Sequence, residues 1–392
     1  MKIAGIICEY NPLHLGHTGQ MEKTRLALGA DCAIVCVMSG NFVQRGDFAI
    51  FNKHARAKAA IQCGADLVLE LPLPYALSSA ERFADAGVYI LDRLGACDYI
   101  AFGSESGDIG ALTDAAAAIV SSKAEMHTKE WLDKGLSYAA AQQKAADAVL
   151  GARSEVFKHP NNLLGIEYLK ALAACESPIK PITVKRTGEH DSDTGLSAFS
   201  MRKELMRGDK PWGRMPNAAA VVFMEEIIAG RGPVFISQCE LAILSRLRAA
   251  KSFAELPGAT EGLENRLLRY AGTEPTFEAI LEKVKTKRYT MSRLRRMLLC
   301  ACLGITAADA QKPPPYIRVM AMSHAGMSIL AEARKKARLP IITKPASAKS
   351  LSGRASDLFS KEAASTDFYV LAYPAENNRC GGQEWRQTPW RA

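Results

Sequence analysis

Residues 9–17, EYNPLHLGH, carry the clearest chemical signal of the chain, two histidines three positions apart. The residues just before them, 3–8, form a short apolar run that is typical of a buried strand. Pro12 stiffens the turn between this run and the histidines, and Gly16 lets the backbone approach a ligand closely. His17 lies at the start of a predicted helix, whose free N–H groups and dipole favour a bound anion. His14 and His17 therefore indicate a triphosphate site, in which imidazoles stabilise charge on the α-phosphate.

Two other interpretations of this histidine pair remain open on the pattern alone. Neighbouring imidazoles can bind a metal ion, and a histidine can also be a purely structural part of a turn. The placement of His14 and His17 between a first strand and a helix favours the phosphate site. We assign no residue to a metal site.

Strand-like and helix-like segments alternate along residues 1–205, as they do in doubly wound folds. The expected strands are residues 3–8, 31–40, 65–72, 97–106 and 181–186. The expected helices are residues 17–29, 52–64, 79–95, 161–174 and one that begins at 197. This order predicts an α/β, Rossmann-like fold with a doubly wound parallel sheet, whose ligands bind at the carboxyl ends of the strands.

The chain is long enough for two domains, and its character changes after residue 205. We expect residues 1–205 to form an ATP-binding catalytic domain, with an Ala-rich helical insertion at about 108–153. Residues 206–392 are expected to form a helix-rich basic domain. Its last residues, from 374 onward, are expected to form a loose tail.

Composition and charge restrict the classes of protein to which the chain can belong. It has 392 residues, 48% hydrophobic and 23% charged, which predicts a folded core. The formal charge of +9 suits a polyanionic partner. The ten cysteines include no Cys-x-x-Cys pair, which predicts free thiols in a reducing compartment rather than a zinc site. No apolar run is long enough for a signal peptide or a membrane span, so we expect a cytoplasmic protein with no membrane contact.

The densest positive charge lies in residues 282–297, EKVKTKRYTMSRLRRM. A solvated helix face, the alternative interpretation, would carry acids among the bases, yet none follows Glu282 in this stretch. The run therefore favours contact with a nucleic-acid phosphate backbone. The residues expected to make it, which we call the basic run, are Lys283, Lys285, Lys287, Arg288, Arg293, Arg295 and Arg296.

Other positions at predicted strand and helix ends suit a bound nucleotide. Gly103 follows the fourth strand, where a missing side chain lets adenine or ribose lie against the backbone. Arg186 ends the fifth strand and can bind phosphate or ribose, with an ordinary surface cation as the alternative. Asn161 and Asn162 open a helix, where one can serve as the N-cap and leave the other for a ligand.

Two motifs resemble those of the nucleotidyltransferase superfamily, which includes the class I aminoacyl-tRNA synthetase cores. Residues 14–17, HLGH, match its His-x-Gly-His signature. Residues 197–202, SAFSMR, stand where a second element, roughly Ile-Ser-Ser-Thr-x-Ile-Arg, is expected. Ser197 and Arg202 fit that element as phosphate ligands at a helix start, whereas Phe199 replaces a residue that commonly carries a hydroxyl.

Longer stretches resemble one family within that superfamily, the tRNA(Met) cytidine acetate ligases. They cover residues 5 to about 297, with PPYIRVM and LPIITK extending the resemblance to about 344. The stretches are GIICEYNPLHLGH, MSGNFVQRGDFAIFNKHARAKAA, GADLVLELP, FGSES, PNNLLGIEYLKAL and TKRYTMSRLRRML.

The resemblance implies an enzyme that activates acetate with ATP as acetyl-adenylate, releasing pyrophosphate. It then acetylates the wobble cytidine of elongator tRNA(Met) at N4, without acetyl-CoA. ATP and Mg²⁺ are the implied cofactors, and acetate and tRNA(Met) are the implied partners. Residues 206–392 are the implied tRNA-binding domain, and His14 and His17 are the implied catalytic residues. The residues implied to bind ATP are Ile7, Cys8, Glu9, Tyr10, Asn11, Pro12, Gly16, Gly103, Asn162, Arg186, Ser197 and Arg202. The alternatives are a small-molecule adenylyltransferase of the same fold and a tRNA-binding protein with a degenerate core.

Overall fold

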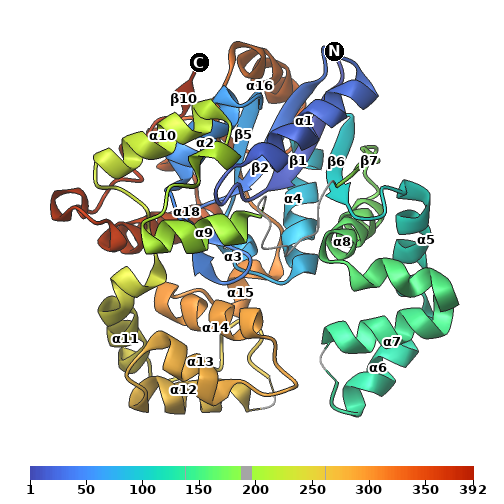
Figure 1. The fold of residues 1–392 in the computed structure, drawn as a ribbon, viewed down its shortest axis with the longest axis vertical. Helices are drawn as coiled ribbons and strands as arrows, with labels where there is room; N and C mark the ends of the chain where they lie inside the picture. Colours follow the sequence, from blue (N-terminus) through green and yellow to red (C-terminus); the bar gives the residue numbers. More distant parts are fainter. Residues whose placement is uncertain (137, 187–196, 261) are drawn as a thin grey trace.

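An eight-stranded sheet forms the centre of the computed structural model, which describes residues 1–136, 138–186, 197–260 and 262–392 (Figure 1). Its order in this described part of the chain is β10-β8-β5-β2-β1-β6-β7, with β9 beside β8. The strands are β1 (Ile3–Cys8), β2 (Ala33–Ser39), β5 (Leu67–Leu71), β6 (Tyr99–Ser104), β7 (Lys180–Lys185), β8 (Ile317–Met322), β9 (Ile341–Ile342) and β10 (Trp390–Arg391).

The five strands expected from the sequence are all present, and neighbours among them are parallel. β1 lies between β2 and β6, so the chain order reverses at β1. A crevice forms at such a reversal, outside the carboxyl ends of the strands. The His14–His17 turn directly follows β1 and therefore lies at this crevice. The predicted Rossmann-like α/β class is thus confirmed.

The sheet is mixed rather than purely parallel, which corrects the prediction. β8 runs antiparallel to β5, and β10 adds a short strand beside β8. The expected loose tail is therefore wrong, because its end joins the sheet and Glu384 within it is fully buried. Both elements belong to the expected second domain, so residues beyond 206 complete the sheet of the first.

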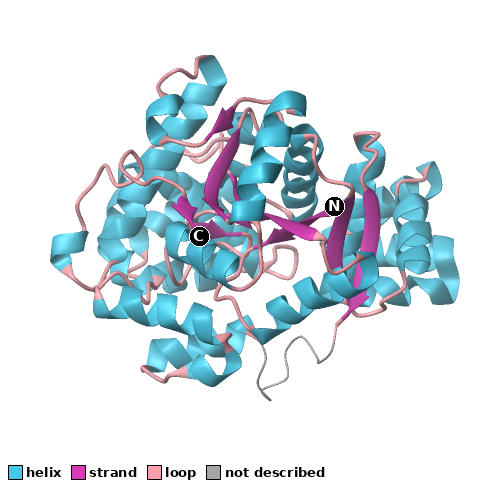
Figure 2. Cartoon of the chain, turned by 90° about the horizontal axis from the view of Figure 1, so that it is seen from above, coloured by secondary structure: helices cyan, strands magenta, loops and turns pink. Residues whose placement is uncertain are grey.

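Helices cover both faces of the sheet, as the view from above shows (Figure 2). Apolar residues of α1 (Leu15–Leu28) and α2 (Lys53–Gln62) pack with one set of alternating strand residues. Those of α4 (Ala80–Leu94), α8 (Pro160–Ala174) and α16 (His324–Lys336) pack with the other set. Side chains of successive strand residues point to opposite faces, so one apolar run fills two cores.

Three helices form the segment that was expected as an insertion, α5 (Ile109–Ile119), α6 (Ser122–Asp133) and α7 (Tyr138–Leu150), at the lower right of Figure 1. A separate helical region occupies the lower left. It consists of α11 (Glu240–Ala249), α12 (Leu263–Thr273), α13 (Phe277–Val284) and α14 (Met291–Leu303). Its core includes Phe42 and Phe48 of a hairpin, β3 (Phe42–Val43) and β4 (Asp47–Phe48), which the sequence analysis missed.

The remaining helices of the described residues range from four residues in α3 to 17 residues in α18. They are α3 (Leu73–Ala76), α9 (Ala198–Arg207), α10 (Asn217–Ile228), α15 (Ala307–Gln311), α17 (Pro345–Ala348) and α18 (Gly353–Tyr369). None of the helices in the described ranges is both long and apolar enough to cross a membrane.

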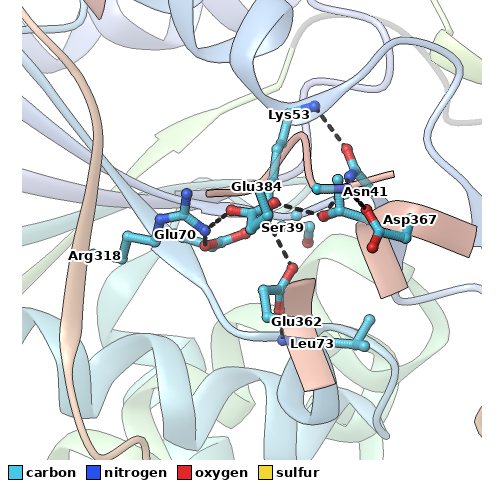
Figure 3. Close-up of polar contacts among 12 residues, drawn as sticks. Ser39, Asn41, Lys53, Glu70, Leu73, Arg318, Glu362, Asp367 and Glu384 are labelled. Carbon is cyan, nitrogen blue, oxygen red and sulfur yellow. Dashed lines mark hydrogen bonds and ion pairs between the residues drawn. The ribbon is translucent and has the colours of Figure 1, made fainter. Parts of the chain in front are cut away.

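Two buried cations and three buried carboxylates join distant parts of the chain near the ends of β2 and β5 (Figure 3). The Lys53 ammonium lies 2.6 Å from Glu70, 2.9 Å from Glu362 and 3.0 Å from Glu384. Arg318 of β8 pairs with Glu70 and Glu384. Because buried charges need partners, this cluster holds the C-terminal segment against the sheet.

Candidate active site at the end of the first strand

The His14 and His17 rings lie together at the N-terminus of α1, stacked with centroids 3.8 Å apart. His14 is the N-cap, and its Nδ1 accepts the Gly16 N–H at 3.0 Å. Nδ1 of His17 accepts the His14 N–H at 3.2 Å. Since both Nδ1 atoms are acceptors, each neutral ring carries its proton on Nε2. The turn therefore prepares two Nε2–H donors.

The surroundings keep both rings uncharged at neutral pH. Burial, with Arg186 and Arg214 nearby, lowers the pKa of His14 from 6.5 to about 4. Burial, with His14 and Arg186, also lowers the pKa of His17 well below its usual value. Each ring therefore donates one hydrogen bond, from Nε2, and the nearby arginines supply the positive charge of the site.

Gly16 leaves room for the His14 ring, which is a more specific function than letting the backbone approach a ligand. A Cβ atom at this position would lie 2.9 Å from Cε1 of His14 and 3.1 Å from its Nδ1. These distances are shorter than ordinary van der Waals contact. The absence of a side chain at Gly16 thus permits the observed position of the His14 ring.

Residues 9–12 connect the first strand to this helix, and their polar groups bind other protein segments. Asn11 Oδ1 accepts the Ile50 N–H at 2.8 Å, and Glu9 Oε1 accepts the Gln44 N–H at 2.7 Å. The Tyr10 ring packs edge-on against His17, with centroids 5.0 Å apart. Of the residues implied to bind ATP, Glu9, Tyr10 and Asn11 thus hold the shape of the turn.

Two further members of that set, Ile7 and Cys8, lie at the end of β1, and Pro12 is buried in the turn. Burial, reinforced by Cys36, raises the pKa of the Cys8 thiol. Cys8 is therefore not a thiolate at neutral pH, and the site offers no cysteine nucleophile here.

The second motif reaches the first through Arg202. Ser197 is the N-cap of α9, as predicted, and its Oγ accepts the Ser200 N–H at 3.1 Å. From the same helix, Nη1 of Arg202 donates to the Asn11 carbonyl at 2.7 Å. The exposed Phe199 ring lies under Lys203, whose Nζ is 4.4 Å from the ring centroid. The loop expected at 187–195 lies outside the described residues.

Gly103 and Arg186 lie side by side at the ends of β6 and β7. A Cβ atom at Gly103 would lie 3.1 Å from Cγ of Arg186. The Arg186 N–H donates to the Ser104 carbonyl at 2.9 Å, and its side chain is exposed. The positive charge of Arg186 also lowers the pKa of both histidines.

Asn162 and Glu105 bind each other's backbone. Oδ1 of Asn162 accepts the N–H groups of Glu105 and Ser106 at 2.9 and 3.1 Å. Glu105 in turn accepts the N–H groups of Asn161 and Asn162. The expectation that one asparagine is the N-cap is wrong, because α8 begins at Pro160 with His159 as its cap. Asn162 therefore holds the loop that follows Gly103.

Arg56 is the principal residue that the sequence analysis missed. It is fully buried in α2 and donates to the carbonyls of Phe51 at 2.9 Å, Glu9 at 2.5 Å, Ser39 at 3.1 Å and Gly40. One guanidinium thus joins the turn after β1 to the turn after β2. The available signal was its position between buried alanines, in HARAKAA, where a solvated cation is not expected.

Three arginines of the basic run bind other segments of the protein, and its other four members are exposed. Arg295 donates to the Gly46 carbonyl at 3.0 Å and pairs with Glu278 at 2.6 Å, and Arg296 donates to the Gln44 carbonyl at 3.1 Å. These two arginines dock α14 on the β3–β4 turn. A third member, Arg293, donates to the Gly258 carbonyl. The exposed members are Lys283, Lys285, Lys287 and Arg288, and Lys285 bonds the Thr286 and Tyr289 carbonyls.

Comparisons with known proteins relate nearly the whole chain to one family. A model of the HIGH nucleotidyltransferase family matches residues 1–384. The tRNA(Met) cytidine acetate ligase of Acetivibrio thermocellus is 38% identical over 412 residues, which covers 99% of each chain. That of Caldanaerobacter subterraneus subsp. tengcongensis is 39% identical over 386 residues, 95% of this chain and 96% of the other. The crystal structure of Thermotoga maritima TmcAL with α-thio ATP has a TM-score of 0.91 and 32% identity, and the match covers 100% of both chains.

Proposed function

Because the chain belongs to the tRNA(Met) cytidine acetate ligase family of HIGH nucleotidyltransferases, we propose that it activates acetate with ATP and acetylates tRNA(Met). The product is N4-acetylcytidine at the wobble position of the elongator tRNA. The observation that carries the chemistry is the neutral, stacked His14–His17 pair at the N-terminus of a long helix, with arginines beside it. Such an arrangement suits the phosphates of ATP. The proposed place of action is the cytoplasm.

In the first step an acetate oxygen attacks the α-phosphorus of ATP. The bond from this phosphorus to the oxygen that bridges the α- and β-phosphates breaks, and pyrophosphate leaves with the electron pair. His14 and His17 donate Nε2–H bonds to phosphate oxygens as negative charge grows there, and Arg186 and Arg202 add positive charge. Catalysis at this step is thus positioning and electrostatic stabilisation.

In the second step the cytidine N4 amine attacks the acetyl carbon of acetyl-adenylate. The carbon–oxygen bond to AMP breaks, AMP leaves with the electron pair, and the amine loses a proton to solvent. The target base has to leave its stack to reach the site, which an anticodon loop allows more easily than a duplex. With Cys8 buried as a thiol, the proposal contains no covalent enzyme intermediate.

Mg²⁺ enters the proposal with ATP. Among the residues that the structure describes, no group of three or more His, Cys, Asp or Glu side chains is placed to hold a metal ion. Mg²⁺ would be held by the phosphate oxygens of bound ATP, whose negative charge it would neutralise. His14, His17, Arg186 and Arg202 are the residues that hold the same phosphates.

Glu9, Tyr10 and Asn11 are proposed to shape the ATP site, and Ile7, Cys8, Pro12, Gly103 and Ser197 to line it. Asn162 supports it through the loop after β6. For tRNA, the exposed Lys283, Lys287 and Arg288 are the proposed phosphate contacts of the basic run. Arg295 and Arg296 instead dock α14 on the β3–β4 turn, whose Gln44 N–H binds Glu9.

The test is incubation of the protein with ATP, Mg²⁺, labelled acetate and elongator tRNA(Met), with and without acetyl-CoA, followed by nucleoside analysis. The expected result is acetylcytidine from acetate and ATP alone, with release of AMP and pyrophosphate. Transfer of AMP to a small molecule, without acetylcytidine, would identify a small-molecule adenylyltransferase and overturn the proposal.

A second experiment separates tRNA binding from acetate activation. The variant K283E/K287E is expected to lose tRNA acetylation and to retain acetate-dependent ATP–pyrophosphate exchange, because each charge reversal removes one phosphate contact. Equal rates of acetylation in this variant and the parent would show that these lysines do not bind tRNA.

A further inference from the structure

A cavity of about 710 Å³ lies between α2, the end of α10 and the C-terminal segment. Asn41 and Asn52 line it, at the two ends of the segment whose Ile50 N–H binds Asn11 in the catalytic turn. One segment thus contacts both the cavity and the catalytic turn, and the cavity lining includes neither histidine of the pair. A volume of this size is in the range of sites for nucleotide-sized ligands.

The cavity lining carries an excess of positive charge. Its cations are Lys58, Arg231, Lys344 and Arg391, and its carboxylate is that of Glu226. Lys58 is paired with Glu225, which lies outside the lining, at 2.8 Å. Glu226 is already paired with Arg231 at 2.6 Å. Within the described part of the chain, no hydrogen bond or ion pair engages the exposed ammonium of Lys344 or the exposed guanidinium of Arg391. These two groups can therefore bind an anion without breaking an existing contact.

Two further features of the cavity lining suit the binding of a nucleobase. His54 lines the cavity, and its Nε2 atom is buried without a hydrogen-bond partner among the described residues. A buried polar atom of this kind needs a partner, which a ligand or water can supply. Trp390 and Gln387 also line the cavity, and aromatic rings and amides are groups that stack on bases and bind their edges.

The wall that carries these groups is held in a defined position. Glu384 lies in the buried charge cluster with Lys53, and it accepts the Thr366 hydroxyl at 2.6 Å (Figure 3). Trp390 pairs with Ala321 in the sheet. Residues 384 and 390 thus fix both ends of the segment that contains Gln387. Such preorganisation lowers the entropic cost of binding a ligand there.

We propose that this cavity is a second nucleotide-binding site, in which Lys344 and Arg391 bind a phosphate while Trp390 and Gln387 contact the base. Two sources share this chemistry, a nucleotide of bound tRNA and a free mononucleotide. The inference rests on the proposed function only for the tRNA source, which is the one we expect. A phosphate contact there would add to those of the exposed basic-run lysines.

The experiment compares the full-length protein with K344E/R391E and with K123E/K129E, which makes the same charge change on exposed residues of α6. Fluorescein-labelled tRNA(Met) is titrated at several salt concentrations, and radiolabelled ATP is measured by equilibrium dialysis. We expect the first variant to bind tRNA more weakly, with the slope of log Kd against log salt reduced by about two, one for each cation that no longer contacts phosphate. K123E/K129E should match the parent.

If K344E/R391E melts at a lower temperature than the parent, the variant K344Q/R391Q repeats the test without charge reversal.

Each outcome decides between the sources or against the site. Unchanged tRNA affinity, together with loss of a second bound ATP equivalent, would support the free nucleotide as the ligand. If neither tRNA affinity nor ATP stoichiometry changes, or if K123E/K129E weakens tRNA binding equally, the proposal is wrong. Acetylcytidine formation by the parent protein is scored separately, so failure of the proposed function remains distinguishable from failure of this site.

Discussion

His14 and His17 stack ring on ring, and each accepts a backbone N–H of their own turn at Nδ1. The backbone of the turn therefore selects the tautomer of both rings, and burial keeps both uncharged. This relationship turns a four-residue motif into a pair of oriented donors. It also makes the consequences of several substitutions specific enough to measure.

Loss of either imidazole should impair acetate activation. His14→Ala and His17→Ala are each expected to lower kcat of acetate-dependent ATP–pyrophosphate exchange by about 10²–10³-fold, the usual effect of removing one transition-state donor. The exposed His324 provides the control, and His324→Ala should leave kcat unchanged. A kcat within twofold of the parent for both active-site variants would remove these rings from the mechanism.

Protein stability should fall on acidification because of the same pair. The pKa of His14 is about 4 when folded against 6.5 when unfolded, so the unfolded chain binds more protons between these values. Stability therefore rises with pH through this window and is lost as pH falls. Between pH 7.5 and 5, His14 accounts for about 2 kcal/mol of that loss. Urea unfolding of the parent and His14→Gln at both pH values measures it, and an equal loss in both proteins would contradict the assignment.

Gly16→Ala should damage catalysis with little effect on folding. The new Cβ atom would displace the His14 ring, and small displacements of a catalytic group cost about 10²-fold in rate. Gly19 lies on the same helix, and a Cβ atom added there would have no neighbour within 4 Å, so Gly19→Ala is the matched control. It should retain activity and gain up to about 1 kcal/mol of stability. Equal exchange rates in the two variants would show that the His14 position is not critical.

Arg56→Lys should weaken both the fold and ATP use, although the charge is kept. Lysine cannot reproduce a planar fork that donates to four carbonyls on three segments, and buried carbonyls without donors cost about 1–3 kcal/mol each. We expect a loss of at least about 3 kcal/mol in urea unfolding and a raised KM for ATP. Arg207→Lys, at an exposed position of α9, should change neither quantity. Parent-like stability in Arg56→Lys would contradict this role.

Glu384→Ala tests whether the C-terminal segment is part of the core. Removing one carboxylate leaves Lys53 and Arg318 with fewer partners in a dry site, a change that typically costs about 3–5 kcal/mol. Glu376, in the same segment with its side chain 88% exposed, is the control. Glu376→Ala should unfold at the urea concentration of the parent. A Glu384→Ala protein that does the same would show that this segment contributes little to stability.

The sequence alone was sufficient for the features that depend on local pattern. Apolar runs of strand length, alternating with helical periodicity, identified the five parallel strands and their order along the chain. The turn after the first strand, with His14, Gly16 and His17, was recognisable because its residues are neighbours. Ser197 was recognised as a helix cap for the same reason, since an N-cap bonds to a backbone group only three residues away.

Only the tertiary structure decided the features that depend on distant partners. Glu384 looks like a residue of a polar tail until Lys53 and Arg318 are placed beside it, 331 and 66 positions away. Arg56 and Lys53 look like surface cations of an Ala-rich helix, and the acids that pair with Arg295 lie outside the basic run. Burial of a charge is stable only with its partners in place. Those partners lie far away along the chain, so the local spacing of residues does not reveal them. Folding brings them together.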